Sequence, residues 1–201
     1  MKICIIIAGG YGQRFNGTPK QFFEINDKKI IEITYNNSKK IFNETYVVVN
    51  EKYKNIKINC ENIYYVKSNC RLDTIINFLK IKPFNNDDLI CIKDANTLFF
   101  PPIMDKLENK TIVFRHCLDS SQYLTKNNKL IKREEIYENI ANFYLYDDLR
   151  LILEEEKIYD YQSEFQYLLE KNKINFVDTN YRSIKITYIE DIEFIKQIQN
   201  L

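Results

Sequence analysis

Residues 5–21 read Ile5-Ile6-Ile7-Ala8-Gly9-Gly10-Tyr11-Gly12-Gln13-Arg14-Phe15-Asn16-Gly17-Thr18-Pro19-Lys20-Gln21, and they contain all four glycines of the 201-residue chain. The β-branched residues at the start of this stretch predict a buried first strand. Glycine allows close approach to the backbone and unusual backbone angles, so the segment after the strand needs a special conformation. Two cations, Arg14 and Lys20, accompany the glycines. A strand followed by a glycine-rich loop and cations suits a polyphosphate, whose charge the loop N–H groups and the cations would share.

The bulk composition limits the classes of partner. The formal net charge is only +1, so overall charge gives no reason to expect nucleic-acid or membrane binding. The five cysteines include no C-x-x-C pair, which favours reduced and mostly buried thiols over disulfides or a zinc site. No signal peptide is recognisable, and no apolar run reaches membrane-spanning length. We therefore expect a cytoplasmic protein.

Short β-branched or aromatic runs alternate with helical patterns along the whole chain. This alternation predicts an α/β fold, in which a mostly parallel twisted sheet is flanked by helices in one Rossmann-like domain over residues 1–201. The less regular stretch 114–146 is expected to be an inserted arm or hairpin. Because ligands bind beyond the carboxyl ends of parallel strands, the glycine loop and Asp94 should face one crevice. The expected strands are 2–7, 45–50, 62–66, 88–93, 111–115 and 174–178, and the expected helices are 29–40, 71–80, 101–107, 147–156, 161–171 and 188–199.

Two common phosphate-binding motifs do not fit the glycine loop. A Walker A loop requires Gly-Lys-Ser or Gly-Lys-Thr, and the chain contains neither. In the dinucleotide fingerprint G-x-G-x-x-G, Phe15 would occupy the third glycine position, which permits close packing of helix on strand. A tight turn that needs glycine only for its geometry is the remaining alternative. Such a turn does not explain the residues Arg14, Pro19, Lys20 and Gln21 that accompany the glycines.

Four sequence blocks resemble the cytidylyltransferases that act on methylerythritol phosphate or ribitol phosphate. Residues 6–21 resemble their opening A-G-x-G-x-R…P-K-Q, and residues 70–75 resemble R-x-D-S-V at the start of a helix. Residues 92–95 resemble the H-D-A segment, and residues 183–192 resemble the closing N-I-K-V-T-x-x-E-D-L. The blocks occur in the family's order and span nearly the whole chain, whereas 114–160 matches poorly. The resemblance implies a nucleotidyltransferase fold, a homodimer and a reaction in which an acceptor phosphate attacks the α-phosphorus of CTP.

The resemblance and the chemistry of phosphoryl transfer together suggest the site residues. Such a transfer needs positioning and charge stabilisation from cations and from a divalent metal, here expected to be Mg²⁺. Asp94 could instead cap a turn, Arg71 could be an exposed charge, and Gln21 is expected to support the loop. The expected catalytic residues are Arg14, Lys20 and Lys185, the nucleotide-binding residues are Ala8, Gly9, Gly10, Gly12, Arg71 and Thr74, the acceptor-binding residues are Asp94 and Arg133, and the metal ligand is Asp94.

The departures from the family concern the acceptor. The family's arginine after H-D-A is replaced by Thr97, and its T-P-Q and T-D-E segments correspond to residues 141–143 and 161–163. Loss of a bidentate arginine changes how an acceptor phosphate or carboxylate can be bound. The chain is in this respect similar to enzymes of surface-polysaccharide decoration, including CTP:phosphoglutamine cytidylyltransferases of capsular phosphoramidate synthesis. A polyol phosphate such as ribitol phosphate, or methylerythritol phosphate, is the alternative acceptor.

Two other functions use the same loop. A sugar-1-phosphate or cofactor guanylyltransferase would differ in the selected base, which the sequence does not reveal. A nucleotide-sensing protein could retain the loop without catalysis, although it would not need the whole set of charged residues. Release of pyrophosphate separates an enzyme from a sensor.

Overall fold

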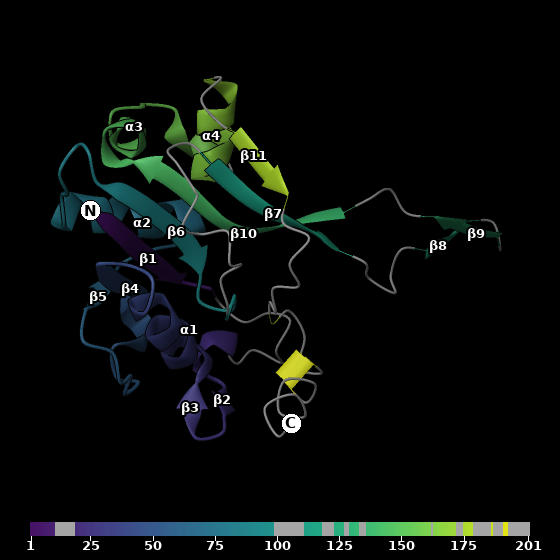
Figure 1. The fold of residues 1–201 in the computed structure, drawn as a ribbon, viewed down its shortest axis with the longest axis horizontal. Coiled ribbons are helices and arrows are strands. Elements are labelled where there is room, and N and C mark those ends of the chain that lie inside the picture. Colours follow the sequence, from purple (N-terminus) through teal and green to yellow (C-terminus); the bar gives the residue numbers. More distant parts are fainter. Residues whose placement is uncertain are drawn as a thin grey trace.

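The computed structural model describes residues 1–10, 19–98, 111–117, 123–126, 129–132, 136–161, 163–171, 175–178, 186 and 191–192. Within these ranges, a seven-stranded sheet has the order β11-β7-β10-β6-β1-β4-β5 (Figure 1). Only β10 runs antiparallel to its two neighbours, so the prediction of a mostly parallel sheet is confirmed. The strands are β1 Lys2–Ala8, β4 Glu44–Asn50, β5 Ile63–Val66, β6 Leu89–Asp94, β7 Thr111–Cys117, β10 Ile136–Leu145 and β11 Asn175–Asp178.

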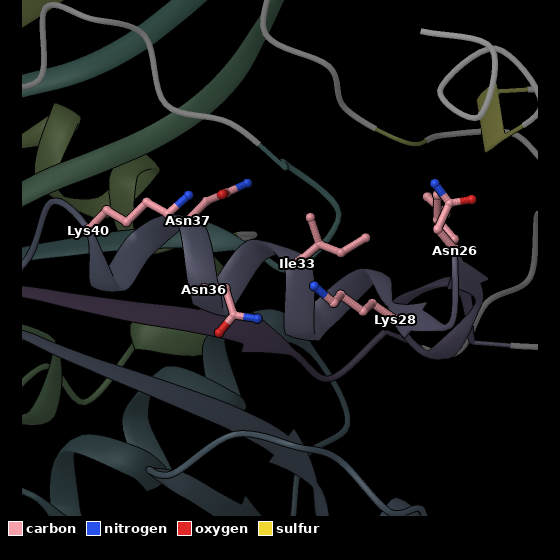
Figure 2. Close-up of a pocket in the computed structure, with 7 residues that line it drawn as sticks. Asn26, Lys28, Ile33, Asn36, Asn37 and Lys40 are labelled. Carbon is pink, nitrogen blue, oxygen red and sulfur yellow. The ribbon is translucent and has the colours of Figure 1, made fainter. Parts of the chain in front are cut away.

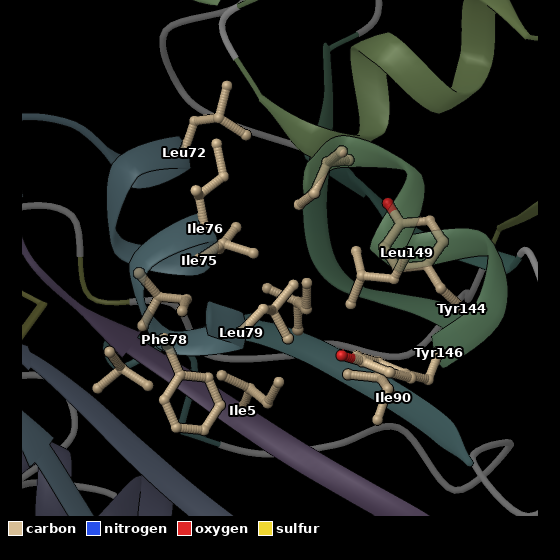
Figure 3. Close-up of a cluster of buried hydrophobic side chains, with 14 of the residues drawn as sticks. Ile5, Leu72, Ile75, Ile76, Phe78, Leu79, Ile90, Tyr144, Tyr146 and Leu149 are labelled. Atoms are coloured by element: carbon tan, nitrogen blue, oxygen red, sulfur yellow. The ribbon is translucent and has the colours of Figure 1, made fainter. Parts of the chain in front are cut away.

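Helices cover both faces of this sheet. The helix α1, Ile30–Lys39, packs Ile31 and Tyr35 against one face of β1 and β4. The helix α2, Arg71–Ile81, packs against the other face together with α3, Tyr146–Leu149, and α4, Glu164–Glu170. Figure 3 shows α2 side chains facing those of α3 above Ile5 and Ile90 of the sheet. Side chains of β1 alternate between the two cores, because successive residues of a strand point to opposite faces.

The predicted helices agree with the structure to different degrees. The ranges 29–40 and 71–80 correspond closely to α1 and α2. The predicted helix 147–156 was wrong in extent, because α3 ends at Leu149 and a 3-10 helix, Arg150–Leu153, follows it. Within the predicted 161–171, α4 covers Glu164–Glu170. The predicted helix 101–107 and all of 188–199 except residues 191 and 192 lie outside the described residues.

The irregular stretch 114–146 contains both an arm and a strand of the main sheet. The strands β8, Tyr123–Lys126, and β9, Lys129–Lys132, pair as a hairpin, which projects away from the sheet in Figure 1. This hairpin agrees with the predicted arm. The strand β10 was not predicted, and it lies in the middle of the sheet between β6 and β7. A bulge between Asn139 and Ala141 interrupts its alternation of side chains.

A small hairpin connects the glycine-loop region to α1. Its strands are β2, Glu24–Ile25, and β3, Lys28–Lys29. The two turn residues, Asn26 and Asp27, have φ angles of 49° and 62°, as a two-residue type I′ turn requires. Short 3-10 helices cover Lys20–Phe22, Glu51–Tyr53 and Ile158–Asp160. None of the helices in the described parts of the chain is long and apolar enough to span a membrane.

Candidate functional site

The candidate site lies where β1 and β6 end. The two strands are parallel neighbours, and their register places Ile7 of β1 opposite Asp94 of β6. Their carboxyl ends open into a pocket of about 380 Å³. The predicted crevice shared by the glycine loop and Asp94 is therefore present. The pocket is lined by Ile7, Ala8, Gly9, Gly10, Lys20, Gln21, Asn69, Cys70, Arg71, Asp94, Ala95 and Asn96.

The two described glycines of the loop have different surroundings. A Cβ atom at Gly9 would lie 2.7 Å from Thr74 Oγ1 and 3.5 Å from Ser68 Oγ, whereas a Cβ atom at Gly10 would have nothing within 4 Å. Neither residue has a φ angle in the left-handed region. Gly9 is thus required by the close approach of the α2 side chain of Thr74. Gly10 lines the pocket, and the open space beside it would let a ligand approach the backbone.

The side chain of Gln21 holds the start of the glycine loop by hydrogen bonds to its backbone. Its Nε2 atom donates hydrogen bonds to the Ala8 carbonyl at 3.0 Å and to the Gly10 carbonyl at 3.1 Å, and the residue is buried. Both carbonyl oxygens are thereby turned toward Gln21. A loop whose carbonyls are bound on one side can present its N–H groups on the other, as an anion-binding loop requires. The hydrogen bonds agree with the expectation that Gln21 supports the loop.

Lys20 lies beside a residue from the far end of the chain. Its Nζ atom donates to the Ile186 carbonyl at 3.2 Å. Asn96 fastens the same residue, because its Nδ2 donates to the Ile186 carbonyl at 2.6 Å and its carbonyl accepts from the Ile186 N–H at 2.9 Å. Ile186 is fully buried. The residue that follows Lys185 in the sequence is therefore bound at the rim of the pocket, although Lys185 itself lies outside the described residues.

Arg71 occupies the first position of α2, and its guanidinium binds two carboxylates. Its Nε and Nη2 atoms donate to Glu164 at 3.3 Å and 3.2 Å, and its Nη1 donates to Asp94 Oδ1. Burial alone would lower the pKa of Arg71, but the charges of Asp94 and Glu164 raise it above its ordinary value. The guanidinium is thus a permanent cation, which binds Asp94 of the pocket on one side and the buried Glu164 on the other. The alternative that Arg71 is merely an exposed charge does not describe these contacts.

Glu164 and Asn142 belong to the same group of side chains and were not predicted. Glu164 is fully buried at the start of α4, and Asn142 of β10 donates to its Oε1 atom at 2.7 Å. The hydroxyl of Tyr144 is buried nearby and has no hydrogen-bond partner among the residues that the structure describes. The sequence offered only weak signals, namely an acidic residue early in a predicted helix and an asparagine in an apolar run. Neither signal indicates which residue is the partner.

Other candidate residues lie beside the pocket or outside the described residues. Thr74 is buried, donates to the Cys70 carbonyl at 3.0 Å and faces Gly9, so it supports the loop and does not line the pocket. Thr97, at the family's arginine position, is also fully buried and is not a lining residue. Asp73 accepts from the Asn69 N–H at 2.9 Å and supports the turn before α2. The candidates Gly12, Arg14, Arg133 and Lys185 lie outside the described residues.

Lys93 is adjacent to Asp94 in sequence but faces the other side of the sheet. It is buried, with 1% of the residue exposed, beside Cys4 and Cys91 in the layer under α1. Desolvation lowers the pKa of Lys93 to about 8. Its position as part of the core, away from the pocket, was not predicted.

The residues at the pocket are compatible with Mg²⁺, although they do not form a closed metal cage. In the part of the chain that the structure describes, no three His, Cys, Asp or Glu side chains are grouped as metal ligands. Asp94 is a partly exposed carboxylate on the pocket wall. Mg²⁺ commonly binds one or two carboxylates, waters and the phosphates of a nucleotide. A single carboxylate therefore fits a cation that arrives with a triphosphate.

A second hollow of about 310 Å³ lies over α1 and the small hairpin (Figure 2). Asparagine and lysine side chains surround it, among them Asn26, Lys28, Asn37 and Lys40. Among the described residues that line it there is no predicted site residue and no carboxylate. The predicted residues that line a pocket in the described part of the chain therefore lie at the ends of β1 and β6.

Comparisons with known proteins agree with this placement. Residues 4–69, about a third of the chain, match the MobA-like NTP transferase domain. Over 51 residues the chain is 41% identical to a probable molybdenum cofactor guanylyltransferase of Aquifex aeolicus (strain VF5), and the match spans 25% of this chain and only 25% of that curated relative.

The whole chain is similar in fold to solved cytidylyltransferases. The 2-C-methyl-D-erythritol 4-phosphate cytidylyltransferase of Francisella tularensis superposes with a TM-score of 0.70 at 20% identity, covering 98% of both chains. The enzyme of the same name from Thermus thermophilus gives a TM-score of 0.73 at 12% identity, covering 100% of both chains. The predicted fold class is confirmed: the chain has the α/β nucleotidyltransferase fold, and its glycine loop lies within the segment that matches an NTP transferase domain.

Proposed function

We propose that the protein is a cytidylyltransferase, which transfers CMP from CTP to a small phosphorylated acceptor and releases pyrophosphate. The observation that carries this proposal is the pocket at the ends of β1 and β6, which is lined by Gly9 and Gly10 of the glycine loop together with Lys20 and Asp94. The loop backbone and Lys20 would supply N–H groups and a cation, which suit a triphosphate. Asp94 would supply a carboxylate, which suits the cation that accompanies a triphosphate.

The proposed reaction is an in-line displacement at the α-phosphorus. An oxygen of the acceptor's phosphate forms the new P–O bond, and the bond to the β-phosphate's bridging oxygen breaks, so pyrophosphate leaves with that electron pair. The N–H groups of Ala8, Gly9, Gly10 and Gly12 would hold the triphosphate, while Arg14, Lys20 and Lys185 would stabilise the charge that develops on it. Asp94 would hold Mg²⁺, which supplies charge neutralisation between the phosphate oxygens when bound.

The acceptor side supports a substrate different from methylerythritol phosphate. Thr97, which replaces the family's arginine, is buried and cannot contact an acceptor in the pocket. We propose L-glutamine phosphate as the acceptor and CDP-L-glutamine as the product, for capsule or cell-surface polysaccharide modification. Asp94 and Arg133 would contact the acceptor. Ribitol phosphate, another polyol phosphate and methylerythritol phosphate are the alternatives, the last supported by the similarity of fold to the cytidylyltransferases that carry its name.

A guanylyltransferase is a second candidate, because a segment of 51 residues is 41% identical to a probable molybdenum cofactor guanylyltransferase. The glycine loop lies within residues 4–69, which match the MobA-like NTP transferase domain, and it would bind phosphates in either case. The selected base thus decides between the two candidates. A homodimer of the kind expected for the cytidylyltransferase family, and a cytoplasmic location, complete the proposal.

The test is pyrophosphate release with Mg²⁺, using CTP, UTP, GTP and ATP against methylerythritol, ribitol, glycerol and L-glutamine phosphates. The proposal predicts release with CTP and one acceptor. Lys20→Ala should lower the rate by about a hundredfold or more, as loss of a charge-stabilising group does. Lys28→Ala, which removes a lysine from the hollow over α1, is the matched control and should leave the rate unchanged. Release with GTP alone would favour the guanylyltransferase, and CTP binding without release would favour a sensor.

A further inference from the structure

We infer, on the basis of the nucleotidyltransferase function proposed above, that Glu164 is a positioning residue for this site. It holds the Arg71 guanidinium in one orientation, so that the Nη1 atom of Arg71 fixes Asp94 at the pocket wall. Glu164 does not line the pocket itself. Its effect on substrate or on a metal ion would therefore pass through Arg71 and Asp94.

Four elements converge to build this group of side chains. Arg71 begins α2, Asp94 ends β6, Glu164 begins α4, and Asn142 lies on β10 opposite Ile92 of β6. Their hydrogen bonds form a chain from Asn142 to Glu164, from Glu164 to Arg71, and from Arg71 to Asp94. A chain of contacts that crosses four elements fixes the position of its last member more rigidly than one neighbour could.

Burial decreases along this chain toward the pocket. The exposed fraction of the side chain is 0% for Glu164, 25% for Arg71 and 37% for Asp94. The buried end is also the end with the most hydrogen bonds, since both oxygens of Glu164 accept from Arg71 and one of them accepts from Asn142 as well. The Glu164 end thus acts as a fixed anchor, while the Asp94 end meets ligand and solvent.

The planar guanidinium makes this arrangement specific. Arg71 uses Nε and Nη2 on Glu164, which defines the plane of the group, and Nη1 then points to Asp94. A lysine would carry the same charge but could not define a plane with parallel donors. The buried Glu164 carboxylate thus fixes the orientation of the guanidinium, and the guanidinium in turn fixes the partly exposed Asp94 carboxylate.

Charge gives the arrangement a further consequence. Two carboxylates and one guanidinium leave this wall with an excess of one negative charge, which suits a cation and opposes a bare triphosphate. Lys20, a cation, lines the same pocket. Replacing Glu164 by glutamine would remove that excess and loosen Arg71 at the same time. The change should weaken productive cation binding more than nucleotide binding.

The experiment compares Glu164→Gln with Glu154→Gln. Glu154 forms an exposed 2.7 Å ion pair with Arg150 outside the pocket, so it controls for loss of a glutamate. We expect Glu164→Gln to lower kcat by about ten- to a hundredfold and to raise the Mg²⁺ concentration for half-maximal rate, as loss of a supporting residue commonly does. The KM for CTP should change by less than about threefold, because uniform nucleotide binding is retained. Glu154→Gln should resemble the wild type in all three quantities.

A readout without catalysis separates this inference from the proposed function. The Nε–H proton of Arg71, observed by ¹H–¹⁵N NMR, should exchange slowly with water in the wild type and rapidly in Glu164→Gln. If the wild type released no pyrophosphate with any substrate, the proposed function would fail. The anchoring of Arg71 by Glu164 would still be supported if the Nε–H proton exchanged slowly in the wild type and rapidly in Glu164→Gln. Wild-type kcat, Mg²⁺ dependence and slow exchange in a folded Glu164→Gln protein would overturn the inference.

A second variant keeps the test decisive if Glu164→Gln does not fold. Asn142→Leu removes one donor from Glu164 and leaves the three charged residues Glu164, Arg71 and Asp94 in place. We expect it to lower kcat by about tenfold, the lower end of the range for a supporting residue. A rate within twofold of the wild type, with unchanged exchange at Arg71, would overturn the inference.

Discussion

The contact between Gly9 and Thr74 yields a sharp prediction about stability. Gly9→Ala would place a Cβ atom 2.7 Å from Thr74 Oγ1, whereas Gly10→Ala would place one with nothing within 4 Å. The two substitutions are chemically identical and adjacent in the chain. They differ in whether the helix α2 approaches the backbone.

The structure sets the size of the expected effect. A separation of 2.7 Å is well inside van der Waals contact, so either the loop or α2 must shift. Such overpacking costs about 1–3 kcal/mol of unfolding free energy. Gly10→Ala should change the unfolding free energy by less than about 0.5 kcal/mol, as is usual for surface substitutions.

A compensating substitution identifies the contact. In Thr74→Ala the hydroxyl is absent, and the nearest remaining atoms are Ser68 Oγ at 3.5 Å and the Cβ of residue 74 at 3.8 Å. This single variant loses the hydrogen bond to the Cys70 carbonyl, at about 1 kcal/mol. The double variant with Gly9→Ala should be more stable than additivity predicts by about 1 kcal/mol or more.

Urea unfolding followed by circular dichroism measures all four proteins at one pH. Equal destabilisation by Gly9→Ala and Gly10→Ala would refute the steric reasoning. Strict additivity in the double variant would also refute it, since the clash would then not involve the Thr74 hydroxyl. The wild-type slope against urea should be retained in each variant, so that the midpoints report stability.

Two further predictions concern buried polar groups. Lys93 has a pKa lowered from 10.5 to about 8, so the unfolded chain binds more protons between these values and stability rises with pH across that window, by about 3 kcal/mol. Lys93→Met should have a higher unfolding free energy than the wild type at pH 7, and this free energy should no longer rise with pH because of residue 93. Cys4 and Cys91 beside it still titrate in the variant. An unchanged pH profile of the unfolding free energy would contradict the prediction. Gln21→Leu removes both hydrogen bonds to the loop carbonyls, which should cost about 1–3 kcal/mol and raise the KM for CTP, whereas equal KM and stability would show that the loop needs no support.

Much of the sheet could be predicted because most of its strands are short runs of apolar, often β-branched residues that can be recognised in the sequence itself. The strand β1 is an almost continuous run of β-branched residues, and such a run in an α/β pattern indicates a strand buried on both faces. The strand β10 was missed for the opposite reason. It contains asparagines and a bulge at Asn139 and Ala141, which remove the period on which a strand prediction depends. Its place in the sheet is determined by tertiary pairing.

The candidate site was predictable where the residues are close in sequence. Lys20 and Gln21 follow the glycine loop within one motif, and the structure brings both to it. The partners of Arg71 lie 23 and 93 residues away. No local pattern specifies Glu164 as a partner, because an acidic residue in the first turn of a helix is ordinarily explained by the helix dipole. Only the packing of α2 and α4 on one face of the sheet reveals the contact.

Transfer of label from CTP tests the proposed function most directly. CTP labelled with ³²P at the α-phosphate would be incubated with Mg²⁺ and each acceptor, and the products would be separated and identified by mass. The proposed reaction predicts label in a CDP-linked product, with unlabelled pyrophosphate released in equal amount. Label recovered only as CMP or unreacted CTP, in the presence of every acceptor of the panel, would contradict a cytidylyltransferase acting on these acceptors.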